Sequence, residues 1–117
     1  MDFSIEFYIS ASGRCPVQEF LDALSASDPG DFAAVVAGLA KLRNRTYHRE
    51  PLSKAIGKGL FELRHVGKLN TRVLWFFTRG KRIILVHGIR NKGQAIAAHD
   101  HEAARDRMRD WVERNTP

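Results

Sequence analysis

Charged side chains interrupt two apolar segments that otherwise have the composition of β-strands. Glu62 and Arg64 stand within GLFELR, and Arg72 stands in the segment TRVLWFF that follows shortly after. Because successive strand residues point to opposite faces, Phe61 and Leu63 can face a core while Glu62 and Arg64 point to the other side. The same alternation lets Arg72 lie beside them, so three ionisable groups are expected to share one concavity.

These residue types favour chemistry on phosphate groups. A guanidinium can bind a phosphate through two parallel hydrogen bonds, and a neighbouring carboxylate can accept a proton or hold an arginine in place. A surface ion pair between Glu62 and an arginine, worth under about 1 kcal/mol, is an equally good interpretation of the pattern alone.

Periodicity predicts the elements that would position these groups. A first strand spans about residues 3–9, and a helix begins at Pro16 with an apolar stripe at Val17, Phe20, Leu21 and Leu24. Asp31 is the expected N-cap of a second helix. A basic stretch without periodicity then leads to three strands near 60–66, 71–78 and 82–87, and a last helix runs from after Gly93 to about Arg114.

This order predicts one α+β domain over residues 1–117, in which helices pack on one face of a small antiparallel sheet. The opposite face would stay open to solvent, as antiparallel sheets allow, and would carry Glu62, Arg64 and Arg72. The aromatic run Trp75 to Phe77 is expected to be mostly core, with Phe76 as the one candidate for stacking on a base.

Composition limits the function classes. The 117 residues carry a formal net charge of +6 and a pI near 10.0, which favours a polyanionic partner, although solubility alone explains many basic domains. No apolar run is long enough for a membrane helix and the N-terminus has no signal-peptide pattern, so a cytoplasmic protein is expected. The single cysteine, Cys15, predicts neither a disulfide nor a metal site, and no cofactor is expected.

Four segments in this order resemble the RelE/ParE superfamily of bacterial toxins, in particular its HigB-like, phage-derived branch. CPVQEFL resembles the first-helix pattern of that family, GLFELR its GLxELR strand, RVLWFF its RxxYF strand, and IILVHG its apolar strand ending in His-Gly. The basic pair that usually follows is changed here to Asn91 and Lys92. The resemblance implies a small curved sheet with helices packed against it.

The resemblance also implies a ribosome-dependent mRNA endoribonuclease that is held inactive by a cognate antitoxin. Such toxins cleave RNA without a metal, by attack of a ribose 2′-OH on the adjacent phosphate. The implied partners are mRNA, the ribosome and a helix-turn-helix, HigA-like antitoxin, and the toxin-antitoxin complex would bind operator DNA. No membrane partner is implied.

The resemblance assigns roles to particular residues. The implied catalytic residues are Glu62, Arg64, Arg72, Lys92 and His99, with Arg72 on the phosphate and His99 as proton donor. The implied RNA-binding residues are Arg43, Arg45, Arg49, Lys54, Lys58 and Arg90. For His87 a structural role is the favoured interpretation, and His65 is expected on the other side of the sheet.

Two other functions remain open from the sequence. A ParE-like gyrase inhibitor would use the same scaffold through protein contact and needs no RNA-cleaving residues. A non-catalytic module would bind nucleic acid only together with its antitoxin, in a repressor complex.

Overall fold

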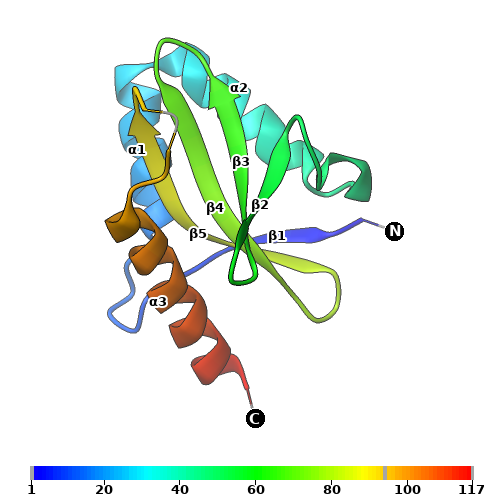
Figure 1. Ribbon diagram of the computed structural model, residues 1–117. Coiled ribbons are helices and arrows are strands. Elements are labelled where there is room, and N and C mark those ends of the chain that lie inside the picture. The colour runs from blue at the N-terminus through cyan, green and yellow to red at the C-terminus, as the bar shows by residue number, and fades with distance from the viewer. Residues whose placement is uncertain (1, 94, 117) are drawn as a thin grey trace.

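The computed structural model describes residues 2–93 and 95–116, which form five strands, three α-helices and one short 3-10 helix. In chain order they are β1 (Ser4–Phe7), α1 (Pro16–Ser27), α2 (Pro29–Lys41), η1 (Arg45–Tyr47), β2 (Ser53–Gly57), β3 (Leu60–Val66), β4 (Asn70–Thr78), β5 (Arg82–Asn91) and α3 (Ala98–Asn115), shown in Figure 1.

The five strands form one sheet in the order β1-β5-β4-β3-β2. The α+β class expected from the sequence is confirmed. The sheet is mixed, however, because β1 lies parallel to β5 while the other neighbours are antiparallel. β2 is a strand that the periodicity did not predict, and it pairs with β3 at the edge of the sheet.

The first two helices begin at prolines, which suit the first helical turn because they lack an N–H that would go unbonded. Cys15 is the N-cap of α1. The N-cap of α2 is Asp28, whose carboxylate accepts a hydrogen bond from the Asp31 N–H at 3.1 Å. The prediction that Asp31 caps this helix is therefore wrong, and its buried side chain serves another purpose described below.

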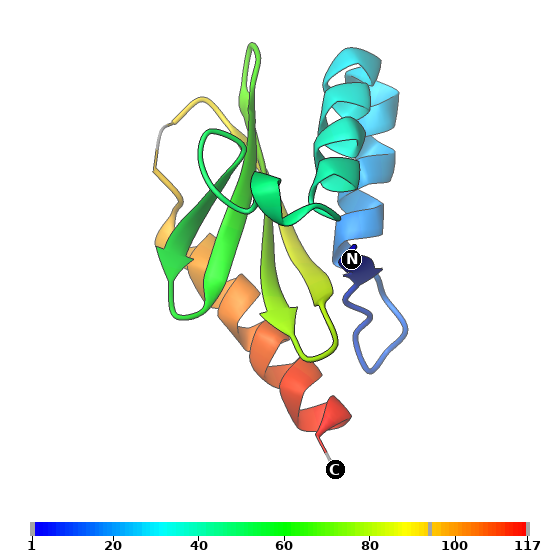
Figure 2. The ribbon, with the colours of Figure 1, turned by 90° about the vertical axis from the view of Figure 1, so that its right-hand side faces the viewer.

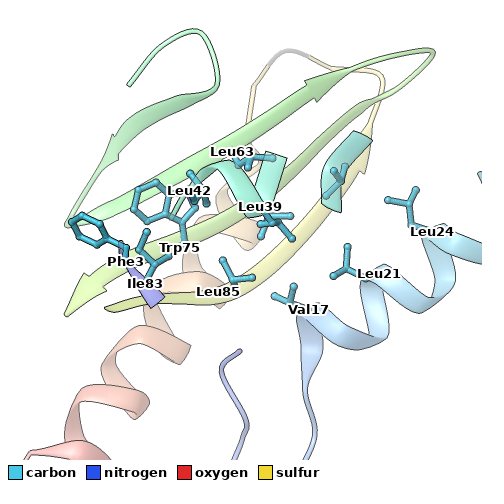
Figure 3. Packing of buried hydrophobic residues seen from close by; sticks show 12 residues of the cluster. Phe3, Val17, Leu21, Leu24, Leu39, Leu42, Leu63, Trp75, Ile83 and Leu85 are labelled. Carbon is cyan, nitrogen blue, oxygen red and sulfur yellow. The ribbon is translucent and has the colours of Figure 1, made fainter. Parts of the chain in front are cut away.

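The α1–α2 pair covers one face of the sheet. Its apolar stripe includes Val17, Leu21 and Leu24, which pack in one buried cluster with Trp75 and Leu85 of the sheet (Figure 3). Val73 and Leu63 belong to the same cluster. The alternation in β3 and β4 therefore assigns this face correctly.

The other face is not open to solvent, contrary to the expectation from the sequence. Figures 1 and 2 show α3 on the side of the sheet opposite α1 and α2. Ala104 is buried there, and Met108 and Trp111 pack against the cluster that contains Leu74 and Phe76. Phe76 contacts Trp111 with 5.7 Å between ring centroids, so it is a core residue and not a surface for stacking a base.

Gly88 of β5 brings α1 close to the sheet. A Cβ atom at this position would lie 2.3 Å from Cγ of Phe20, whose ring occupies the space that a larger residue would need. We expect Gly88→Ala to lower the free energy of unfolding by about 1–3 kcal/mol, because the ring must shift out of a packed position. Urea denaturation measures the change. The control is Gly93→Ala, since a Cβ atom at Gly93 would lie no closer than 4.0 Å to the nearest atom found among the described residues. Equal urea midpoints for the two variants would contradict the packing described.

Candidate active site

Glu62, Arg64 and Arg72 share the α3-facing side of the sheet. Arg64 of β3 lies directly opposite Arg72 of β4 in the antiparallel register, and Glu62 lies opposite Leu74, a residue of the α3-facing core. Directly opposed residues project from the same face. The juxtaposition of these three side chains predicted from the alternation is thus present.

Arg72 and Glu62 form a buried ion pair. The Nε atom of Arg72 lies 3.0 Å from Oε2 of Glu62, and the side chains are only 1% and 5% exposed. Nη1 of Arg72 also donates to Oδ1 of Asn91 at 3.3 Å. In this arrangement the guanidinium of Arg72 is directed to protein groups and does not line an open surface. The expectation that Arg72 lies on an open face is therefore wrong, because its side chain is buried against Glu62 and Asn91.

A cleft of about 270 Å³ lies beside this pair. Its charged and titratable lining residues are Lys54 of β2, Glu62 and Arg64 of β3, and His101 of α3. Ile56, Ala95 and Ile96 supply apolar walls. The cleft therefore combines two cations, a carboxylate and an imidazole, and three separate parts of the chain contribute them.

His101 lines the cleft in place of His99, although the sequence pattern pointed to His99. The structure places His99 outside the cleft, with 83% of its side chain exposed and Nε2 3.4 Å from Oδ2 of Asp100. Residues two positions apart on an α-helix point about 200° apart, so only one of the two histidines can face the sheet. Lys92 follows β5 as an exposed residue and is not among the described residues that line the cleft.

The predicted RNA-binding residues lie in four separate places, of which the last, that of Arg90, is described in the next paragraph. Lys54 lines the cleft. Arg45 and Arg49 line hollows around η1, and Arg43 is exposed nearby with Nη2 3.7 Å from a carboxylate oxygen of Asp2. Lys58 is exposed in the turn between β2 and β3, where its backbone has a positive φ of 59°.

Arg90 lies on the side of the sheet opposite the cleft, where it forms ion pairs with Asp28 and Asp31 at the start of α2. Its Nη2 atom is 2.7 Å from Asp28 and 3.0 Å from Asp31, and His65 lies 3.1 Å from Asp31. The hydrogen bond from Arg90 keeps the pKa of Asp31 below its usual range against the opposing effect of burial, and His65 adds to the lowering. Arg90 is therefore engaged at the junction of α1 and α2, which gives it a structural role and separates it from the cleft.

His87 joins α3 to the sheet. Its Nε2 atom lies 2.7 Å from Oδ1 of Asp100, and Nη1 of Arg107 donates both to Nδ1 of His87 at 2.7 Å and to the Val86 carbonyl at 2.9 Å. This geometry fits a neutral imidazole that donates from Nε2 and accepts at Nδ1. The structural role favoured for His87 is consistent with these bonds.

The His87 bonds predict how stability depends on pH. Burial lowers the pKa of His87 below its usual 6.5, and the charge of Arg107 lowers it further, while Asp100 opposes the change. The unfolded chain then binds more protons below about pH 6.5, so the free energy of unfolding should fall as pH drops, by up to about 1.4 kcal/mol per pH unit. Urea denaturation at pH 7.5 and 5.5 should show a smaller loss for His87→Gln than for the unsubstituted protein. Equal losses would contradict a neutral His87.

Neither a metal cluster nor a membrane-spanning helix is found in the described part of the chain. Across residues 2–93 and 95–116, no three His, Cys, Asp or Glu side chains gather in a way that could hold a metal ion. Within the same residues, no helix has both the length and the apolar character needed to cross a membrane.

Comparison with known proteins identifies the family. No curated protein sequence matches the chain. The family model described as phage-derived protein Gp49-like (DUF891) matches residues 19–109, which is well over half of the chain and includes β2 to β5 and every described residue that lines the cleft. The chain therefore belongs to the phage-derived Gp49-like family, a RelE-like family of toxins in toxin-antitoxin systems.

Proposed function

We propose that this protein is an endoribonuclease toxin of the HigB-like branch, which cleaves translated mRNA in the cytoplasm. The observation that carries the proposal is the cleft itself, in which Lys54, Glu62, Arg64 and His101 surround one volume large enough for a phosphodiester and its ribose. These are the group types that metal-independent RNA cleavage requires. The basic net charge of +6 supports a polyanionic substrate.

The reaction begins when the ribose 2′-OH attacks the adjacent phosphorus. Glu62 accepts the proton of the 2′-OH as general base, while Arg64 and Lys54 stabilise the negative charge that develops on the phosphate oxygens. His101 donates a proton to the leaving 5′ oxygen as the P–O5′ bond breaks. The products are a 2′,3′-cyclic phosphate and a 5′-hydroxyl end, so neither water nor a redox partner is consumed in this step.

Arg72 acts as a positioning residue in this proposal. Its ion pair with Glu62 fixes the carboxylate at the wall of the cleft, and its own guanidinium is buried. Direct contact with the phosphate is therefore assigned to Arg64, the neighbouring arginine that the cleft exposes.

A toxin of this family implies an antitoxin partner. We propose that this partner is a helix-turn-helix protein of the HigA type and that the complex binds operator DNA. Co-expression of such a protein, encoded beside this one, should suppress the toxicity described next.

Induced expression in a bacterial host tests the proposal. Translated messages should be cut within minutes, with new 5′ ends that map at codon positions, and untranslated RNAs should be spared. Intact messages together with arrested replication would instead identify a gyrase inhibitor. Harmless expression, combined with operator binding only in the presence of the antitoxin, would identify a non-catalytic repressor module.

A further inference from the structure

The segment around η1 forms a second hollowed surface, which among the described residues shares only Arg64 with the cleft. A hollow of about 520 Å³ is lined by Tyr47, Arg49 and Arg64, among others. A second hollow, of about 400 Å³, shares Arg49 with it and adds Arg45 and His48. A third, of about 430 Å³, shares Arg45 and His48 with the second and adds residues from the start of the chain and the β4–β5 hairpin. We call these three hollows together the η1 groove.

The η1 groove and the cleft meet at Arg64. Arg64 lines both the cleft and the first hollow, so one side chain borders the two surfaces. From there the shared residues lead around η1 to the side of the sheet that carries α1 and α2, where Phe3 and Phe77 line the third hollow. A linear ligand seated in the cleft would have a path out of it along this groove.

The charge of the groove favours a polyanion. Its described lining residues include five cations and a single acid, Glu50; the cations are Lys41, Arg45, Arg49, Arg64 and Lys81. Several cations along one path suit a chain that carries a phosphate at every residue.

Two partly exposed aromatic rings lie among these cations. Tyr47 and Phe77 are each 37% exposed, which is unusual for Phe77 because its alternate neighbours on β4 are fully buried. The ring of Phe77 is supported by His48 and Phe3, with centroid distances of 5.1 and 5.7 Å. Partly exposed rings are platforms on which nucleic-acid bases stack. The Nζ atom of Lys41 lies 5.5 Å from the centroid of the Tyr47 ring, so a base at Tyr47 would share the ring with this cation.

We propose that the η1 groove binds single-stranded RNA that extends from the cleft, with bases against Tyr47 and Phe77 and phosphates against Arg45, Arg49 and Lys81. This inference deepens the proposed function and rests on it, since it takes the cleft as the place where the RNA is cut. The exposed rings favour RNA over an acidic protein segment, which would need the cations but not the stacking surfaces.

Binding of RNAs of two lengths tests the inference. Fluorescence anisotropy would use 2′-O-methyl oligonucleotides of 4 and 12 residues, which cannot be cleaved because the attacking hydroxyl is blocked. Arg45→Glu should weaken binding of the 12-mer at least tenfold and leave the 4-mer nearly unchanged. The slope of log affinity against log salt should also become shallower for the 12-mer, by roughly 0.7 for each phosphate that the variant no longer neutralises.

Arg109→Glu is the matched control, because it makes the same charge change at an exposed arginine on α3, away from the η1 groove. Phe77→Leu, checked for folding by thermal denaturation, should weaken the 12-mer by roughly fivefold or more without altering the salt slope, since stacking involves no ion release. Equal weakening by Arg45→Glu and Arg109→Glu would overturn the inference, as would equal effects on both lengths.

The remaining outcomes separate this inference from the proposed function. If the 12-mer binds in this length-dependent way but natural RNA is not cleaved, the proposed RNA binding by the groove stands and the proposed nuclease activity is wrong. If Arg45→Glu changes neither RNA cleavage nor binding of the 12-mer, the proposed nuclease activity stands and the proposed RNA binding by the groove is wrong. If Arg45→Glu weakens binding of a polyglutamate peptide but not binding of RNA, the ligand of the groove is an acidic protein segment.

Discussion

Arg72→Ala is expected to destabilise the protein by about 3–5 kcal/mol, because it leaves the carboxylate of Glu62 buried without the guanidinium that lies 3.0 Å from it. For a domain of this size the destabilisation corresponds to a fall in melting temperature on the order of 10–20 °C. Thermal denaturation followed by circular dichroism measures it directly.

A double variant is the control for this prediction. Glu62→Met with Arg72→Met removes both charges and keeps apolar volume, so it should recover most of the stability. If the single and double variants melt together, the pair is not the buried ion pair described. Because Arg72→Ala impairs folding, its loss of toxicity would not by itself assign Arg72 a role in catalysis.

Arg64→Ala is expected to reduce RNA cleavage by a factor of about 10²–10³ while leaving the melting temperature almost unchanged. Arg64 is partly exposed at the cleft, and removal of one preorganised group that faces the developing charge typically has an effect of this size. Single-turnover cleavage of a defined message in a translating extract gives the rate constant.

Arg109→Ala provides the comparison for Arg64→Ala, since it removes the same charge from an exposed helix position. It should cleave at the unsubstituted rate. Arg64→Lys should retain part of the activity, because lysine keeps the charge but loses the two-point geometry of arginine. Full activity in Arg64→Ala would exclude this arginine from phosphate stabilisation.

Some features of the fold followed from the sequence because they depend on local periodicity. The alternation in β3 and β4 correctly separated Glu62, Arg64 and Arg72 from Phe61, Leu63 and Trp75, since a strand has only two faces. β2 escaped prediction because an edge strand of five residues, SKAIG, is too short and too polar to show a clear period.

The position of α3 could not be predicted from its own residues. The apolar stripe of Ala104, Met108 and Trp111 predicts that this helix packs against another element. It does not predict which face of the sheet, because that depends on which face still has apolar side chains left uncovered by the other helices. With α1 and α2 on one side, Leu74 and Phe76 remain on the other, and α3 covers them. That placement brings His101 of α3 to the cleft. Arg72, which the sequence placed on an open face, is buried.

The chemical nature of the cleaved ends tests the central claim most directly. The purified protein is incubated with ribosome complexes that hold a translated message, and cleavage is assayed after free metal has been chelated. The cut message should end in a 2′,3′-cyclic phosphate on one fragment and a 5′-hydroxyl on the other. A single 2′-deoxy substitution at the cut nucleotide should abolish that cut. Products with a 5′-phosphate, or cleavage that survives the 2′-deoxy substitution, would contradict the proposal that the Lys54, Glu62, Arg64 and His101 cleft catalyses attack by the ribose hydroxyl.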